Sequence, residues 1–313
     1  MAGDKCFTMQ QLCEQLSGVY DEREARAVVL WLLEVTFGLS RTDVLCGAVE
    51  QLSADDRQRL QAMMGRLQQG EPVQYVAGVA DFGPRLFRVA PGVLIPRPET
   101  YELCQWVSLV ESGERREERE MLSVLDVGTG SGCIACTLAL DLPGAQVTAW
   151  DVSQEALAIA ADNASRLGAD IVFQHKDILH ESEAACNATT VPHPAPSPTA
   201  LPHPAPSPRH CWDIIVSNPP YICESERQQM ERHVLDHEPA LALFVPDDDA
   251  LRFYRAIGLY GLHTLRPGGC LFLELNAAHA DETATLLQHQ GYADITVRRD
   301  QFGRQRLLKA TRP

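Results

Sequence analysis

The tetrapeptide Asn218-Pro219-Pro220-Tyr221 follows the apolar run Ile214-Ile215-Val216 and is the segment of this chain that best indicates a chemistry. The asparagine side chain offers an amide oxygen, and the two prolines stiffen a backbone that presents carbonyl acceptors. Such acceptors suit a planar NH2 group that is to be methylated, as in a side-chain amide or an exocyclic amine. The same residues would also form a rigid turn after a strand. The motif alone leaves both interpretations open.

A glycine-rich loop lies upstream, between the strand-like run from Val124 and a helical pattern over Cys133 to Leu140. Glycines let a backbone turn tightly and approach a ligand, and a helix N-terminus supplies unpaired N–H groups. A dinucleotide-binding loop would read G-x-G-x-x-G, whereas this loop reads G-x-G-x-G after a carboxylate. That carboxylate suits the ammonium group of S-adenosylmethionine better than a phosphate. We therefore expect this cofactor, with a structural turn as the alternative, to be bound by Asp126, Gly128, Thr129, Gly130, Ser131 and Gly132.

Two further carboxylates end later strand-like segments. Asp151 follows Trp150, where a carboxylate accepts hydrogen bonds from ribose hydroxyls in nucleotide-binding sheets. Its alternative role is to cap the helix that begins near Ser153. Asp177 would accept a hydrogen bond from the adenine amine, and Ile178 would pack on the adenine ring. Asp177 would serve equally well as a turn cap. Asn218 is the last predicted cofactor contact.

The second half of the chain alternates strand and helix patterns, which predicts an α/β fold with a doubly wound, mostly parallel sheet. Ligands of such sheets bind beyond the carboxyl ends of the strands, where these motifs fall. The expected strands are Ser123 to Val127, Gln146 to Val152, Ile171 to His175, Trp212 to Ser217 and Cys270 to Leu275, with an edge hairpin from Asp294 to Arg298 and Arg306 to Ala310 around Gly303.

The first part of the chain has helical periodicity and no strand-like alternation. We expect a helical bundle over residues 1–75, in which Ser53 caps a helix, and then a β-hairpin and linker over residues 76–98. The prolines of Leu94 to Thr100 make that linker stiff. The α/β domain is expected to span residues 99–313.

One segment fits neither domain. Pro192 to Pro198 recurs almost unchanged as Pro202 to Pro208, without apolar periodicity. We expect a disordered or polyproline-like surface insertion at about residues 185–210, most simply a tolerated one. His193 and His203 lie on this segment and are not credited as metal ligands.

Composition narrows the function classes. The net charge of −15 over 313 residues disfavours direct nucleic-acid binding, which requires clustered basic residues. The ten cysteines are scattered, as expected of free thiols in a reducing cytoplasm. Cys133-Ile134-Ala135-Cys136 lacks a second ligand pair for zinc, so we interpret both cysteines as small helix residues and expect no metal. No apolar stretch is long enough to span a membrane and no leader peptide is evident.

Taken together, the chain resembles the PrmC/HemK family, the protein-(glutamine) methyltransferases that modify peptide chain release factors. The resemblance covers nearly the whole chain apart from the proline repeat, and is far more specific than Asn-Pro-Pro-Tyr alone. It rests on Pro72 to Tyr75, Val93 to Thr100, Asp126 to Gly132, Asp151, Ser217 to Ile222, Glu238 to Leu243 and Asp300 to Arg306.

The resemblance implies that the substrate is the glutamine of the Gly-Gly-Gln motif in class I release factors. The methyl group goes to the side-chain amide nitrogen, the N-terminal domain helps to dock the factor, and S-adenosylhomocysteine is the second product. We expect Asn218, Pro219, Pro220 and Tyr221 to bind the substrate. Within this motif, the Asn218 side-chain oxygen and the Pro219 carbonyl accept the two N–H bonds, and Tyr221 packs on the amide plane. Placement supplies most of the rate enhancement.

Two local departures from the family pattern stand out besides the insertion. Tyr101 replaces an acidic residue, and Phe244 to Asp249 lacks the usual glycines. Both put loop geometry in question more than activity. Two other functions stay open at this point: a DNA or RNA amino-methyltransferase, which would require a basic cleft, and a non-catalytic protein that retains the cofactor fold.

Overall fold

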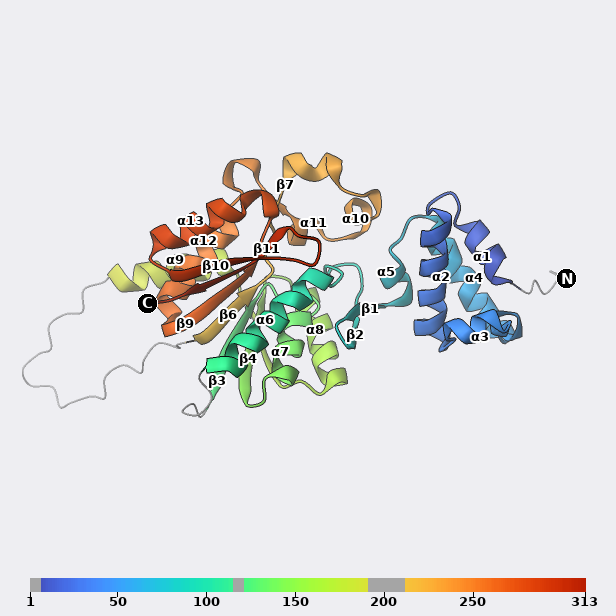
Figure 1. The fold of residues 1–313 in the computed structure, drawn as a ribbon, viewed down its shortest axis with the longest axis horizontal. Coiled ribbons are helices and arrows are strands. Elements are labelled where there is room, and N and C mark those ends of the chain that lie inside the picture. The colour runs from blue at the N-terminus through green and yellow to red at the C-terminus, as the bar shows by residue number, and fades with distance from the viewer. Residues whose placement is uncertain (1–6, 115–120, 191–211) are drawn as a thin grey trace, which may run out of the picture.

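The computed structural model describes residues 7–114, 121–190 and 212–313. Figure 1 shows a helical bundle at one end of the molecule and a sheet covered by helices at the other. A short helix and a two-stranded hairpin join them. The duplicated proline segments and most of the 185–210 insertion lie outside the described residues.

The N-terminal bundle buries one apolar core. Its helices begin at polar caps, and Ser53 accepts from the backbone N–H of Asp56 as expected. Leu32, Leu33 and Leu60 are fully buried where the helices meet. The helices are α1 (Met9–Gln15), α2 (Glu22–Phe37), α3 (Arg41–Leu45) and α4 (Ala54–Gln68).

The junction with the second domain is fixed by side-chain hydrogen bonds. Arg66 pairs with Glu71 and also donates to the carbonyl groups of Tyr75 and Val76, at 3.0 and 3.2 Å. Helical structure thus continues through α5 (Val73–Ala77), two residues past the expected end of the bundle. The predicted hairpin follows as β1 (Val79–Phe82) and β2 (Arg85–Arg88). The Tyr75 hydroxyl donates to the Val93 carbonyl at 2.6 Å and ties the linker to α5.

The second domain contains a seven-stranded sheet in the order β10-β11-β9-β6-β3-β4-β5. The run from β9 to β5 is parallel, and β11 and β10 form the predicted antiparallel hairpin. The strands are β3 (Leu122–Val127), β4 (Ala145–Asp151), β5 (Ile171–His175), β6 (Trp212–Ser217), β9 (Leu265–Glu274), β10 (Ala293–Arg299) and β11 (Gln305–Thr311).

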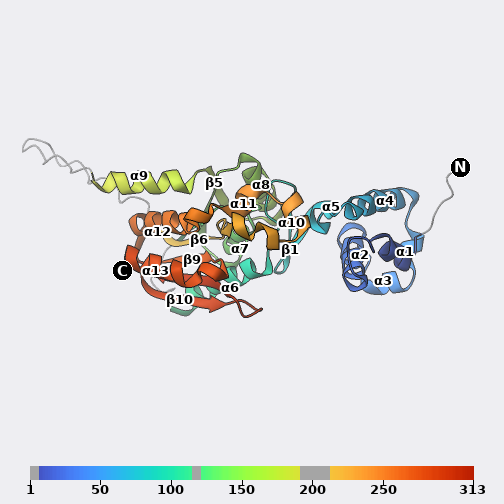
Figure 2. The same ribbon diagram turned by 90° about the horizontal axis from the view of Figure 1, so that it is seen from above.

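Helices cover both faces of this sheet (Figures 1 and 2). Alternate strand residues point to opposite faces, so Ile214 packs with α6 and α7, whereas Ile215 packs with α12 and α13. The doubly wound fold is therefore confirmed. The helices are α6 (Pro98–Glu114), α7 (Cys133–Asp141), α8 (Gln154–Leu167), α9 (Ile178–Thr190), α12 (Arg252–Thr264) and α13 (Ala280–Gln290).

Most strand ends lie within one residue of the sequence-based expectation, and two boundaries differ from it by about five residues. The strand β9 begins at Leu265 rather than Cys270. The helix α9 continues to Thr190, so residues 185–190 are helical and do not belong to the expected insertion. Helix α9 lies beside α12, and this tertiary contact sustains a helix over a sequence that is weakly periodic.

Short elements follow the Asn-Pro-Pro-Tyr motif. The strand β7 (Ile222–Cys223) pairs in parallel with β8 (Phe244–Val245). Helices α10 (Arg232–His237) and α11 (Ala240–Leu243) lie between them in the chain. This small pair extends the structure beyond the carboxyl end of the main sheet.

The packing of α7 on α8 yields a prediction about Gly132. Its φ is +80°, and a Cβ there would lie 3.0 Å from the Ala160 Cβ. We expect Gly132→Ala to lower the free energy of unfolding by about 1–2 kcal/mol for the left-handed backbone. Overpacking against α8 adds roughly 1–3 kcal/mol. Gly144→Ala is the matched control, because its φ is +82° and no atom lies within 4 Å of the added Cβ. Urea titration of both variants tests this, and equal losses would contradict it.

Candidate active site

A cavity of about 330 Å³ opens at the carboxyl ends of β3, β4 and β6. The chain continues from β3 to one side of the sheet and from β6 to the other, so this is the switch point where doubly wound folds bind ligands. Its wall combines the glycine loop, the segments after β4, β5 and β6, and the proline-rich linker before α6. The predicted motifs thus meet at one cavity.

The glycine loop is held by β4 and leaves open space on its cavity side. The backbone N–H groups of Gly128 and Thr129 both donate to the Trp150 carbonyl, at 2.9 Å. Gly128 and Gly130 have positive φ, and a Cβ at either would meet no protein atom within 4 Å. The conformation therefore requires glycine, and the space beside the backbone is available to a ligand.

Asp126 lies behind this loop rather than on the cavity wall. Its Oδ2 accepts from the Thr129 hydroxyl at 2.6 Å and from the Ala135 N–H at 3.2 Å. Its Oδ1 has no hydrogen-bond partner among the described residues. Burial raises the pKa of the Asp126 carboxyl to about 7, and the two hydrogen bonds oppose that rise. Asp126 thus shapes the loop and retains one unused acceptor.

Asp151 lines the cavity and also supports the loop. Its Oδ2 accepts from the Gly130 N–H and its Oδ1 from the Ser153 N–H, both at 2.8 Å. Ser153 itself caps α8, so Asp151 is not the N-cap that was its alternative role. Burial raises the pKa of this carboxyl. Each oxygen keeps lone-pair capacity for a further donor from the cavity.

Asp177 and Ile178 also line the cavity. The Asp177 carboxylate accepts from the Leu179 N–H at 2.9 Å, and its carbonyl accepts from the Glu181 N–H at 2.9 Å. Asp177 therefore caps the first turn of α9, the alternative that the sequence had left open. This cap does not prevent a cavity contact, because the second carboxylate oxygen has no recorded bond to the described residues.

The Asn-Pro-Pro-Tyr motif divides between the cavity and the protein interior. Asn218, Pro219 and Pro220 line the cavity, whereas Tyr221 is not among the described lining residues. The Asn218 Nδ2 donates to the Thr100 hydroxyl at 3.0 Å. The Tyr221 hydroxyl donates to Glu274 at 3.1 Å, and the Arg306 guanidinium lies 5.7 Å from the ring centre. The predicted contact between Tyr221 and a substrate amide therefore remains a prediction.

The sequence did not predict the structural roles of several residues in this region. Glu238 accepts from Arg97 at 2.5 Å and from the Ile95 N–H at 3.2 Å, which fastens the linker beside α11. Thr100 and Glu274 are 2% and 1% exposed. One signal was available: Glu274 is a carboxylate within an apolar strand, and such groups are seldom fully buried without partners.

The two departures from the family pattern have structural roles. The Tyr101 ring packs edge-on against Phe82 of the hairpin, at 5.4 Å between ring centres. In the segment from Phe244 to Asp249, the Asp247 carboxylate accepts hydrogen bonds from the backbone N–H and the hydroxyl of Ser225, at 3.0 and 2.8 Å. Phe244 lies beneath the Arg227 guanidinium. Tyr101 thus packs α6 against the hairpin, and the segment from Phe244 to Asp249 is bonded to the segment that follows β7.

The eight cysteines in the described ranges are free, and Cys133 and Cys136 are buried residues of α7, as predicted. Within those same ranges, no cluster of three His, Cys, Asp or Glu side chains could hold a metal ion. No helix within residues 7–114, 121–190 and 212–313 combines the length and the apolar character that crossing a membrane requires.

Known proteins match both domains of this chain. The family model for the PrmC N-terminal domain matches residues 8–78, and a methyltransferase domain model matches residues 124–191. A release factor glutamine methyltransferase from Bacteroides thetaiotaomicron is 42% identical over 96% of this chain and 97% of its own. The enzyme of that name from Flavobacterium psychrophilum is 35% identical, covering 96% of each chain.

Among solved structures, a release factor-specific protein-(glutamine-N5) methyltransferase from Alicyclobacillus acidocaldarius is 28% identical. The match covers 72% of this chain and 99% of that one, at a TM-score of 0.38. The sequence relatives are similar along almost their whole length, including the N-terminal domain. The resemblance seen in the motifs is therefore confirmed, and the chain belongs to the release factor glutamine methyltransferase family.

Proposed function

We propose that the protein transfers a methyl group from S-adenosylmethionine to a release factor glutamine, on the side-chain amide nitrogen of the Gly-Gly-Gln motif. The observation that carries this proposal is the orientation of Asn218 at the cavity wall. Its NH2 group is bonded to Thr100, so its oxygen remains to accept a hydrogen bond from a substrate NH2. Family membership names the class of amide.

The cavity suits the proposed cofactor in shape and in donor set. Gly128 and Gly130 leave backbone space for a ligand, and Asp151 offers acceptors suited to two ribose hydroxyls. Asp126 lies behind the loop with one oxygen unused, and we assign to its charge an attraction for the methionine ammonium across the loop. When bound, S-adenosylmethionine supplies an electrophilic methyl group next to a positive sulfur. We assign adenine contacts to Asp177 and Ile178.

The protein's part in the reaction is to place a poor nucleophile. An amide nitrogen shares its lone pair with the carbonyl group, so its reactivity depends on how it is held. We infer that the Asn218 oxygen and the Pro219 carbonyl accept the two N–H bonds. Pro219 and Pro220 keep this backbone stiff. Tyr221 supports the motif through its bond to Glu274.

The proposed partner is a protein, and the place where that protein acts indicates the cell compartment of this enzyme. With a net charge of −15, the chain is poorly suited to holding a phosphate backbone directly. A release factor substrate places the enzyme in the cytoplasm, where translation ends. We assign the N-terminal domain, which matches the family's own N-terminal model, to docking of the factor.

The first prediction of this subsection concerns Asn218. Purified protein, labelled S-adenosylmethionine and a class I release factor should give a mass gain of one methyl on the Gly-Gly-Gln peptide. Asn218→Ala should lower the rate by a factor on the order of 10² to 10³, the effect of losing one preorganised hydrogen-bonding group. Cofactor affinity should change little.

Duplex DNA and RNA serve as competing acceptors in the same experiment. Label on a nucleobase instead of glutamine would establish the amino-methyltransferase alternative. Label on neither, with intact cofactor binding, would establish the non-catalytic one. Near wild-type transfer by Asn218→Ala would refute the role assigned to this residue.

A second prediction uses the pKa of Asp126, which burial raises to about 7. A cationic ammonium bound at the glycine loop would lower that pKa, because a nearby positive charge favours the carboxylate. Cofactor binding near neutral pH should therefore release a proton, and affinity should rise as pH increases through about 7. Calorimetric titration in buffers of different ionisation enthalpy measures the released proton.

Asp126→Asn should abolish this proton release, whereas Asp177→Asn should retain it. Release that persists in Asp126→Asn would assign the proton to another group. Cofactor affinity that falls with rising pH would contradict the predicted sign.

A further inference from the structure

Glu274 stands directly beside the Asn-Pro-Pro-Tyr motif in the sheet. Ser217 of β6 pairs with Leu273 of β9, so the next residues along the two parallel strands are Asn218 and Glu274. Glu274 is 1% exposed and does not line the cavity. A carboxylate in this position is costly unless donors surround it.

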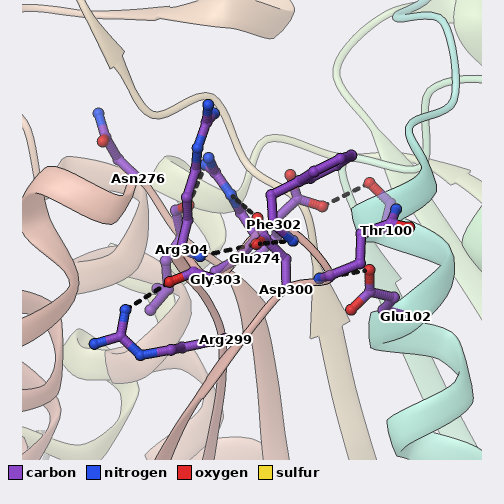
Figure 3. Close-up of polar contacts among 12 residues, drawn as sticks. Thr100, Glu102, Glu274, Asn276, Arg299, Asp300, Phe302, Gly303 and Arg304 are labelled. Atoms are coloured by element: carbon purple, nitrogen blue, oxygen red, sulfur yellow. Dashed lines mark hydrogen bonds and ion pairs between the residues drawn. The ribbon is translucent and has the colours of Figure 1, made fainter.

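Both oxygens of Glu274 bond to residues of the site. The Thr100 hydroxyl donates to Oε2 at 2.5 Å, a contact between α6 and β9 that Figure 3 shows. The Tyr221 hydroxyl donates to Oε1 at 3.1 Å. Arg306 approaches the Tyr221 oxygen at 3.4 Å, and arginine only donates. The tyrosine proton is therefore directed toward Glu274, which acts as an acceptor.

The bond from Thr100 to Glu274 also determines how the Asn218 amide is oriented. A hydroxyl has a single proton, and here it is committed to Glu274. The Thr100 oxygen must then accept from its other neighbour, and the Asn218 Nδ2 lies 3.0 Å away. The asparagine amide is fixed with nitrogen toward Thr100 and with oxygen on the opposite side.

A proton donor at position 274 would reverse this chain. It would donate to Thr100, whose proton would turn to Asn218 and favour the amide with its oxygen inward. The Asn218 NH2 would then face the cavity and oppose a substrate NH2. Burial raises the pKa of the Glu274 carboxyl, while the bonds from Thr100 and Tyr221 and the charge of Arg306 oppose that rise.

We propose that Glu274 is a positioning residue which, through Thr100, keeps the Asn218 oxygen directed into the cavity. This inference rests on the proposed function for its catalytic consequence, but the orientation itself is independent of activity. The same carboxylate fixes Tyr221, so a single buried group holds the first and the last residue of the motif.

The test uses the full-length protein and two isosteric changes. Glu274→Gln leaves a single acceptor oxygen for the Thr100 and Tyr221 hydroxyls, and Thr100→Val removes the Thr100 hydroxyl. Thr100→Ser is the matched control because it retains the hydroxyl. We expect the first two to lower kcat for release factor methylation by 10²-fold or more, on the order of one lost catalytic hydrogen bond. KM for S-adenosylmethionine should stay within about threefold, and Thr100→Ser should recover most of the rate.

A double variant separates the relay from two independent packing roles. Glu274→Gln with Thr100→Val should be no slower than Thr100→Val alone, because both changes break one chain of bonds. If the rate loss of the double variant instead equals the product of the two single losses, the relay is overturned. If Glu274→Gln fails to fold, the pair Thr100→Val and Thr100→Ser decides the question, and equal rates for these two would overturn the proposal.

A measurement without substrate distinguishes this proposal from the proposed function. In nuclear magnetic resonance of the free protein, the Asn218 side-chain NH2 protons should show cross-relaxation with Thr100 protons. The signal should vanish in Thr100→Val, which leaves the Asn218 amide without this acceptor, and its persistence there would overturn the orientation argument. A wild-type protein with the signal but without release factor methylation would instead refute the proposed function alone.

Discussion

Strand β3 pairs with β4 on one side and with β6 on the other, and the functional site depends on this double pairing. Val127 is level with Trp150 in one ladder and with Ser217 in the other. The glycine loop, Asp151 and Asn218 therefore all begin at one height on the same edge of the sheet. Parallel strands with a shared register bring distant parts of the chain together without any long-range side-chain contact.

Buried carboxylates hold the loops at this edge of the sheet in a fixed shape. Asp126 and Asp151 each bond to a loop residue and to a backbone N–H beyond it, and neither forms an ion pair with a basic side chain of the described residues. Burial of a carboxylate without a counter-ion opposes folding, and hydrogen bonds offset only part of that cost. This cost lowers the stability of the domain, but the loop has its shape before a ligand binds.

The sequence was a good guide to whatever depends on local pattern. β5 and β6 have the predicted bounds, since runs such as Trp212–Ser217 are apolar, short and followed by prolines. The cavity-lining positions of Asp151, Asp177 and Asn218 followed from their places at strand ends.

What depends on side-chain direction was beyond a single sequence. Asp126 points behind its loop, and Tyr221 turns toward Glu274 instead of the cavity. Thr100 is far from Glu274 along the chain, and only the packing of α6 on β9 brings them together. The end of α9 was misplaced for a similar reason, because its contact with α12 is tertiary.

The duplicated proline segments join the last residue of α9 to the first residue of β6. Helix α9 starts at the cavity with Ile178 and runs away from it, while β6 runs toward the cavity and reaches it at Asn218. The end of α9 and the start of β6 thus both lie away from the cavity, toward the opposite ends of the strands (Figure 1). A duplication there lengthens a connection between two points remote from the chemistry, so the added length need not disturb the arrangement of the catalytic edge.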